Sequence, residues 1–178
     1  RTSAFRYALG YVDGLAREYG VEREELRAYA QANCRGLHGI ARAFDVFEHM
    51  DGRSDNGGES EARAAMILAG VAAPELQVEI TRPGNAGYYL ADYGWQMPNG
   101  SWMLAELHGL GKFEDDAQNE PEHTAAKTYR AALMRDANLR AMGHNVIHFK
   151  LADTYDVKAF GSMMRGYGIP TTKPYADS

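Results

Sequence analysis

The residues best suited to chemistry lie between positions 88 and 113, where two apolar runs flank a Pro-Asn-Gly turn. Asp92 belongs to the first run and Glu106 to the second, and His108 and Lys112 follow shortly after. Two carboxylates with a nearby ammonium group can bind a hard divalent cation and activate a water molecule. A histidine beside them can serve as a general base or as a metal ligand, because its ordinary pKa of about 6.5 is close to neutral pH.

A purely structural interpretation of the same stretch is also open, in which Asp92 caps a turn and Glu106 is a solvated strand residue. Apolar runs bounded by turn residues are typical of strands, so we expect a hairpin closed at residues 98–100. Both acids come late in their strands, and we expect antiparallel pairing alone not to place them opposite each other. A bulge or bend near Tyr93 and Gly94 would bring the two carboxylates together.

A third acid, Glu59, begins an apolar helical stripe that runs from residue 59 to residue 69. An acid at this end of the stripe can point at the sheet on which the helix packs. Alternatively, Glu59 complements the helix dipole or pairs with Arg63 one turn later. Glu61 is the competing candidate for the functional acid.

The surrounding pattern predicts an α/β chain in four parts. Residues 1–50 form a helical extension or the remnant of a preceding domain, with a helical nucleic-acid-binding element as the alternative. Residues 51–58 are a polar linker, 59–167 the main domain, and 168–178 a loose tail. Within the main domain we expect a helix, three strands, a helix from about residue 121 to 142, a strand over 145–151, and a last helix. The helix before the last strand makes that strand parallel to one neighbour.

The composition limits the cellular compartment in which we expect the protein and the covalent and metal bonds that its cysteine can make. Cys34 is the only cysteine, which excludes a disulfide within the chain and cysteine-based structural zinc. No apolar run reaches the roughly 20 residues that span a bilayer, and no signal peptide is visible, so we expect a cytoplasmic protein. The chain starts at Arg1 rather than methionine, and we therefore expect a piece of a longer protein.

The net charge of −5 argues against a surface that is basic throughout, but the basic residues are concentrated late in the chain. Between residues 123 and 150 the sequence carries five lysines and arginines. We expect Lys127, Arg130 and Arg135, on the long helix, to contact nucleic-acid phosphates.

Four segments resemble, in the same order, a family of domains related to the very-short-patch-repair (Vsr-like) endonucleases. Residues 106–113 resemble the signature E-x-D-G-x-x-K-Y, and residues 59–63 an E-S-x-x-R helix start. Residues 91–95 resemble an aspartate followed by an aromatic strand end, and residues 135–147 a closing helix and strand. The family belongs to the restriction-endonuclease-like, PD-(D/E)xK superfamily, and its domains are similar to the C-terminal parts of some AbiEi-like abortive-infection proteins.

The resemblance implies a restriction-endonuclease-like core, with a mixed sheet of about four strands flanked by helices. It also implies that Asp92 and Glu106 ligate Mg²⁺ or Mn²⁺, with Glu59 as a third ligand, directly or through water. Lys112 would contact the scissile phosphate or steady the attacking hydroxide. His108 stands where the superfamily commonly has its lysine, two residues after the acid.

Three departures from the family pattern favour a lapsed catalyst. The family's usual aspartate is His108 here, a basic residue of the last strand is replaced by His148, and a Glu-Lys pair falls on Ala132 and Leu133. The leading hypothesis is a metal-dependent DNA endonuclease. The alternatives are a lapsed nuclease fold that acts as a nucleic-acid-binding or regulatory module, and a protein-interaction domain.

Overall fold

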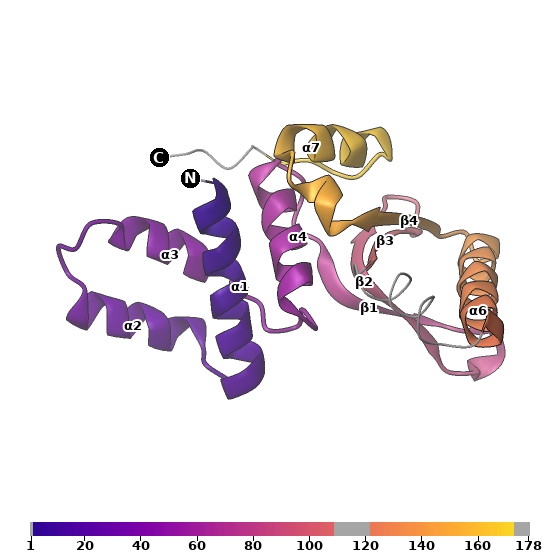
Figure 1. The fold of residues 1–178 in the computed structure, drawn as a ribbon, viewed down its shortest axis with the longest axis horizontal. Helices are drawn as coiled ribbons and strands as arrows, with labels where there is room; N and C mark the ends of the chain where they lie inside the picture. Colours follow the sequence, from indigo (N-terminus) through magenta and orange to yellow (C-terminus); the bar gives the residue numbers. More distant parts are fainter. Residues whose placement is uncertain (1, 109–121, 173–178) are drawn as a thin grey trace.

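A four-stranded mixed sheet lies between helices in this computed structural model, with α4 against one face and α6 against the other (Figure 1). The strand order is β1-β2-β3-β4. Strand β2 is antiparallel to both β1 and β3, and β4 is parallel to β3. The predicted α/β class and the parallel last strand are confirmed, because α6 carries the chain from β3 back to the start of β4.

The structure describes residues 2–108 and 122–172, and the elements follow the expected order closely. Lys112 and the rest of the connection between the third strand and the long helix, residues 109–121, lie outside the described residues. The helices are α1 (Thr2–Tyr19), α2 (Arg23–Asn33), α3 (Ile40–Glu48), α4 (Gly57–Leu68), α6 (Glu122–Ala141) and α7 (Val157–Gly166). The strands are β1 (Glu75–Thr81), β2 (Tyr88–Gln96), β3 (Trp102–His108) and β4 (Asn145–Lys150), with short 3₁₀ turns at Pro83–Asn85 and Leu151–Thr154.

Helix α4 is the element on which both halves of the molecule pack. It begins at Gly57, two residues before the predicted start, because the side chain of Asn56 accepts a hydrogen bond from the backbone N–H of Glu59. All but three of its twelve residues are buried, since α1 covers one side of the helix and the sheet covers the other. A helix buried all round needs no narrow apolar stripe, which explains why small residues dominate its sequence.

At one point along β1 and β2, the buried side chains switch from one face of the sheet to the other. Leu76 and Tyr93 pair and pack on the α4 side, whereas Val78 and Ala91 pair and pack on the α6 side. Residues two apart in a regular strand share a face, so both strands twist between these pairs. Between them the ladder skips Asp92 and its opposite residue Gln77, which has a φ of 52°.

The N-terminal helices are joined to the main domain through a shared core. Phe5, Leu9 and Val12 of α1 pack with Ala64 and Ile67 of α4. The division at residues 51–58 stays a prediction, but α1 and α4 bury their apolar faces against each other.

Two buried arginines strengthen this contact. Arg63 Nη2 lies 2.7 Å from Asp13 Oδ2, and both side chains are at most 7% exposed. Arg6 donates to the carbonyl oxygen of Thr154 at 3.0 Å and to its hydroxyl at 2.7 Å. Charged side chains of α1 therefore contact the main domain both near its start, at Arg63, and near its end, at Thr154.

The first residues of the predicted tail are held in place. Ile169 is buried, and Ala72 N donates to Pro170 O at 2.9 Å, as Thr172 N does to Gly70 O. Residues 169–172 are therefore not loose, and 173–178 lie outside the described residues. Among the residues described, no helix is both long enough and apolar enough to cross a membrane.

Candidate functional site

Asp92 and Glu106 are neighbours on adjacent strands. The ladder between β2 and β3 pairs Tyr93 with Ala105, and the next position on each strand is Asp92 and Glu106. The expectation that antiparallel pairing alone would not place them together was wrong, because the turn closes the hairpin so that 93 and 105 are in register. The irregular point of β2 lies at Asp92 itself rather than at Tyr93 and Gly94.

The Asp92 carboxylate takes the place of a backbone acceptor at the point where this ladder ends. Its Oδ2 accepts a hydrogen bond of 2.8 Å from the backbone N–H of Leu107. The side chain is thus held between β2 and β3 by a fixed donor.

Glu106 faces α6 and forms an ion pair there. Leu104, two residues earlier on β3, packs on the α6 side, whereas Ala105 packs on the α4 side. Arg135 of α6 donates from Nη2 both to Glu106 Oε1 and to the carbonyl oxygen of Leu90. Arg135 was expected to contact phosphate, and the structure places it instead against the candidate metal ligand Glu106.

Glu59 approaches from the opposite face of the sheet. Its carboxylate accepts hydrogen bonds from the backbone N–H of Asp55 at 2.7 Å, from Asn56 Nδ2 at 2.7 Å and from Gln77 Nε2 at 3.1 Å. It does not pair with Arg63, which is bound to Asp13. Gln77 is the residue opposite Asp92 at the face change, so Glu59 reaches the same irregular point from the α4 side.

Burial and mutual repulsion raise the pKa of two of these acids. Burial, with a smaller contribution from the charge of Asp92, raises the pKa of Glu59 to about 7. Burial and then the charge of Glu106 raise the pKa of Asp92 to about 6, although the Leu107 N–H and Arg135 act in the other direction. Acids with raised pKa values in one place are typical of functional sites and of positions that favour a bound cation.

The raised pKa of Glu59 predicts that the protein loses stability as pH rises. The folded state holds this proton up to about pH 7, whereas the unfolded chain releases it near 4.5. Between these values the native state binds more protons, so the free energy of unfolding should fall by on the order of 3 kcal/mol. Denaturant unfolding between pH 4.5 and 7.5 measures this decline. Glu59→Gln should remove the part due to Glu59 and leave the smaller part due to the raised pKa of Asp92.

The matched control is Glu75→Gln, at an exposed position at the start of β1. It should leave the pH dependence of unfolding as it is in the wild type. If Glu59→Gln and the wild type give parallel curves of stability against pH, Glu59 does not titrate in this range.

A second group of titratable residues lies on the α6 side. The rings of His108 and His148 are stacked, with centroids 4.7 Å apart and planes 11° apart. His148 Nε2 lies 2.7 Å from Asp136 Oδ2. Burial, followed by the nearby His148, lowers the pKa of His108, while Asp136 and Asp92 oppose that change. His108 is therefore close enough to both Asp92 and Asp136 to respond to their charges.

The remaining predicted residues are placed as follows. Lys127 and Arg130 are exposed on α6. Lys112 lies outside the described residues, four positions after the end of β3. Over residues 2–108 and 122–172, no three His, Cys, Asp or Glu side chains form a group that could hold a metal ion.

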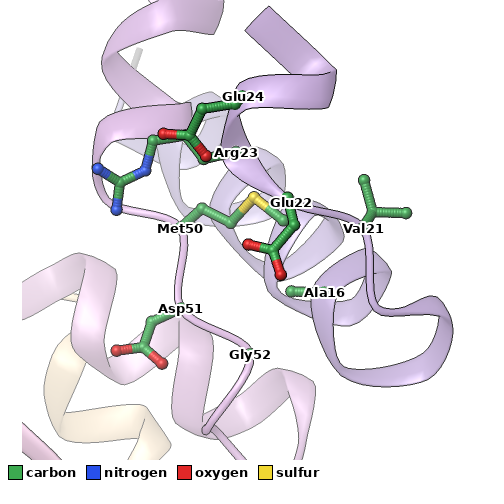
Figure 2. Close-up of a pocket in the computed structure, with 8 residues that line it drawn as sticks. All are labelled: Ala16, Val21, Glu22, Arg23, Glu24, Met50, Asp51 and Gly52. Carbon is green, nitrogen blue, oxygen red and sulfur yellow. The ribbon is translucent and has the colours of Figure 1, made fainter.

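Two pockets occur among the N-terminal helices, away from these residues. One, of about 390 Å³, is formed where the α1–α2 turn meets residues 50–52 (Figure 2). Two of its charged residues pair with residues outside the lining, because Asp51 bonds to Arg53 and Arg23 pairs with Glu48. The other, of about 420 Å³, lies between α2 and α3. Neither is lined by a residue that the sequence pointed to.

Two features of the site were not found from the sequence. The sequence did not single out Asp136, and Arg135 was expected only to contact phosphate. A signal was present, because Asp136 lies three residues before the buried Leu139 and therefore on the same side of α6. An acid on the buried side of a helix calls for a partner, but the sequence does not say which one.

Comparison with known proteins finds two similar proteins, but neither has a described function. No model of a known protein family matches the sequence. No solved structure matches it either. Over 88 residues the chain is 36% identical to two curated proteins of Mycobacterium tuberculosis, both described as uncharacterized, from strains CDC 1551 / Oshkosh and ATCC 25618 / H37Rv. The matched stretch is 49% of this chain, and it spans about a third (32%) of the length of these curated relatives.

Proposed function

We propose that this protein is a metal-dependent phosphodiester hydrolase that cuts DNA, built on a restriction-endonuclease-like core. The observation that carries the proposal is the position of Asp92 beside Glu106, where the ladder of β2 and β3 ends. The order of the surrounding elements, α4, then β1 to β3, then α6 and β4, agrees with the core that the Vsr-like resemblance implies.

The donor set suits a hard cation of the Mg²⁺ class. Mg²⁺ is commonly held by one or two carboxylates, and waters and substrate phosphate oxygens supply the rest. Asp92 and Glu106 would hold it, with Glu59 acting through water from the other side of the irregular point. The repulsion that raises the pKa of Asp92 is what a bound cation would relieve. When bound, Mg²⁺ or Mn²⁺ would acidify a water and neutralise charge on the phosphate.

The chain's own residues have separable tasks in this proposal. Arg135 would hold the carboxylate of Glu106 in place before the cation arrives. When the cation binds, Glu106 would either leave Arg135 or stay paired with both. His108, two residues further along β3, would accept a proton from the attacking water. Lys112 would supply positive charge to the scissile phosphate. Lys127 and Arg130, exposed on α6, would contact phosphates along the DNA backbone.

One observation favours a second candidate, a lapsed nuclease fold that binds or regulates without cutting. The carboxylate of Glu106 is already paired with the positively charged guanidinium of Arg135. A guanidinium bound to a ligand carboxylate competes with a metal ion for that carboxylate. In that case the domain would keep the nucleic-acid surface of α6 and lose metal chemistry.

Metal-dependent thermal stability separates these two candidates without a known substrate. A cation that binds only the folded state stabilises it by about 2.7 kcal/mol at one hundred times its Kd. For a domain of this size the melting temperature should rise by roughly 2–4 °C per kcal/mol. We expect millimolar Mn²⁺ to produce such a rise in the wild type, and Asp92→Asn combined with Glu106→Gln to abolish it.

Three further variants define the outcome. Glu79→Gln, exposed on β1, controls for nonspecific ion effects, and His108→Ala tests whether this imidazole holds Mn²⁺ alone. Arg135→Gln should strengthen the response by freeing Glu106. A response seen in Arg135→Gln but not in the wild type would establish the lapsed candidate. If no variant responds to Mn²⁺ and none binds DNA, the domain recognises proteins instead.

A further inference from the structure

Asp136 is buried in α6 and directed at a histidine of the edge strand β4. The residue is 8% exposed, and its Oδ2 lies 2.7 Å from His148 Nε2. A carboxylate at that distance is an acceptor, so Nε2 of His148 carries a proton. Arg140 Nη2 is 3.7 Å from the same oxygen, on a side chain that is 56% exposed, and adds little.

Stability alone gives no reason for this arrangement. The second oxygen of Asp136, Oδ1, is buried and has no hydrogen-bond partner among the described residues. A half-satisfied buried carboxylate costs free energy, whereas an apolar residue at this position could pack beside Leu139 without that cost. Groups of this kind are concentrated at sites where a side chain must be held in one orientation.

The orientation of the His148 ring in turn limits the orientation of His108, which belongs to the candidate site. Its ring is stacked on the ring of His108, at 4.7 Å and nearly parallel. The two parallel strands fix this contact, because the ladder of β3 and β4 pairs Glu106 with His148 and His108 with Lys150. The ring of His148 therefore limits the plane of His108, and Asp136 limits the plane of His148.

We propose that Asp136 and His148 are positioning residues, which hold the imidazole of His108 in one orientation next to Asp92 and Glu106. The role of His108 toward a substrate rests on the proposed hydrolase activity. The physical coupling of the three side chains does not, and it can be measured in the protein without metal or DNA.

Nuclear magnetic resonance on the full chain with ¹⁵N-labelled histidine tests the coupling. Long-range ¹H–¹⁵N spectra should show the proton of neutral His148 on Nε2. The ring signals of His108 should shift in Asp136→Ala and in His148→Ala, because the stack loses its support. Asp136→Asn keeps an oxygen acceptor for Nε2–H. At a pH where His108 is neutral, so that the lost charge of Asp136 does not change its protonation, this variant should leave the signals of His108 close to their wild-type positions.

Cleavage of a DNA oligonucleotide with Mn²⁺ tests the consequence. In Asp136→Ala and His148→Ala we expect kcat to fall by about 10–100-fold, the range typical of residues that orient a working group. KM and the Mn²⁺ midpoint should change by less than about twofold. Asp136→Asn should recover most of the rate, which a merely destabilised protein would not do.

His38→Ala, at an exposed position between α2 and α3, is the matched control and should alter neither readout. Unchanged His108 signals in both His148→Ala and Asp136→Ala would overturn the inference, whatever the activity. If the His108 signals shift but the wild type cuts no DNA, the positioning is supported and the hydrolase proposal fails. A rate lost through KM alone would also overturn the role in positioning.

Discussion

Replacement of Asp13 with alanine should lower the free energy of unfolding by about 3–5 kcal/mol, because it leaves the guanidinium of Arg63 buried without its counter-ion. Asp13 is fully buried and accepts from Arg63 Nη2 with both oxygens, at 2.8 and 2.7 Å. It also accepts from the backbone N–H of Asp51, at the start of the predicted linker. Thermal and denaturant unfolding should show a melting temperature lower by about 10 °C.

Glu18→Ala is the matched control for this prediction. It removes an acid from the same helix that pairs with Arg17 in solvent, and it should change the free energy of unfolding by less than about 1 kcal/mol. Asp13→Leu combined with Arg63→Met should recover much of the stability, since an apolar pair of similar volume needs no counter-ion. If Asp13→Ala costs no more than Glu18→Ala, the contact between α1 and α4 does not depend on this ion pair.

The largest effect on activity should come from the paired carboxylates. If the proposed function holds, Asp92→Ala and Glu106→Ala should each reduce Mn²⁺-dependent cleavage by at least about 10³-fold. The loss of a metal ligand removes several kcal/mol of transition-state stabilisation, and each 1.36 kcal/mol is a factor of ten in rate. Single-turnover cleavage of labelled single- and double-stranded DNA measures the rates.

Two comparisons make this result interpretable. Glu79→Ala, which removes an exposed carboxylate from β1, should cut at the wild-type rate. Lys112→Ala should lose rate but keep its response to Mn²⁺, because an ammonium group acts on the phosphate and not on the cation. A wild-type rate equal to that of Asp92→Ala would identify a contaminating nuclease as the source of cleavage.

The elements themselves could be predicted because each carries a local signal. Gly20 and Gly143 have φ values of 66° and 89°, which favour glycine, and they end α1 and α6 where the sequence indicated. Residues 98–100 close the hairpin as expected, with Met97 N donating to Ser101 O at 2.8 Å. The start of α4 was misplaced by two residues, since the cap is made by Asn56 inside a stretch of polar residues with several possible caps.

The register of the hairpin was harder to infer from the sequence. Counting from strand ends suggested that antiparallel pairing would not place Asp92 opposite Glu106, but β2 begins at Tyr88 and continues past Asp92 to Gln96. Pairing is counted from the turn, and Asp92 and Glu106 are each about equally far from it along their strands. Their adjacency was therefore present in the sequence as a spacing, and was missed because the strand ends were used as the reference.

The partners of the charged residues could not have been predicted. Asp13 and Arg63 are 50 positions apart, and Arg135 and Glu106 are 29 apart. Which acid meets which base depends on how α1 and α6 lie against the rest of the chain, and this is fixed by packing rather than by local spacing. The stack of His108 on His148 depends in the same way on the parallel register of β3 and β4.

The change of faces at Gln77 and Asp92 has a consequence for the cooperativity of unfolding. Because β1 and β2 each contribute side chains to the clusters on both sides of the sheet, neither cluster can open while these two strands stay paired. We therefore expect the two clusters to unfold as one cooperative unit, in which the backbone amides of the sheet exchange with solvent together. Asp92 lies at the point that joins them, so opening of the candidate site should require opening of this whole unit.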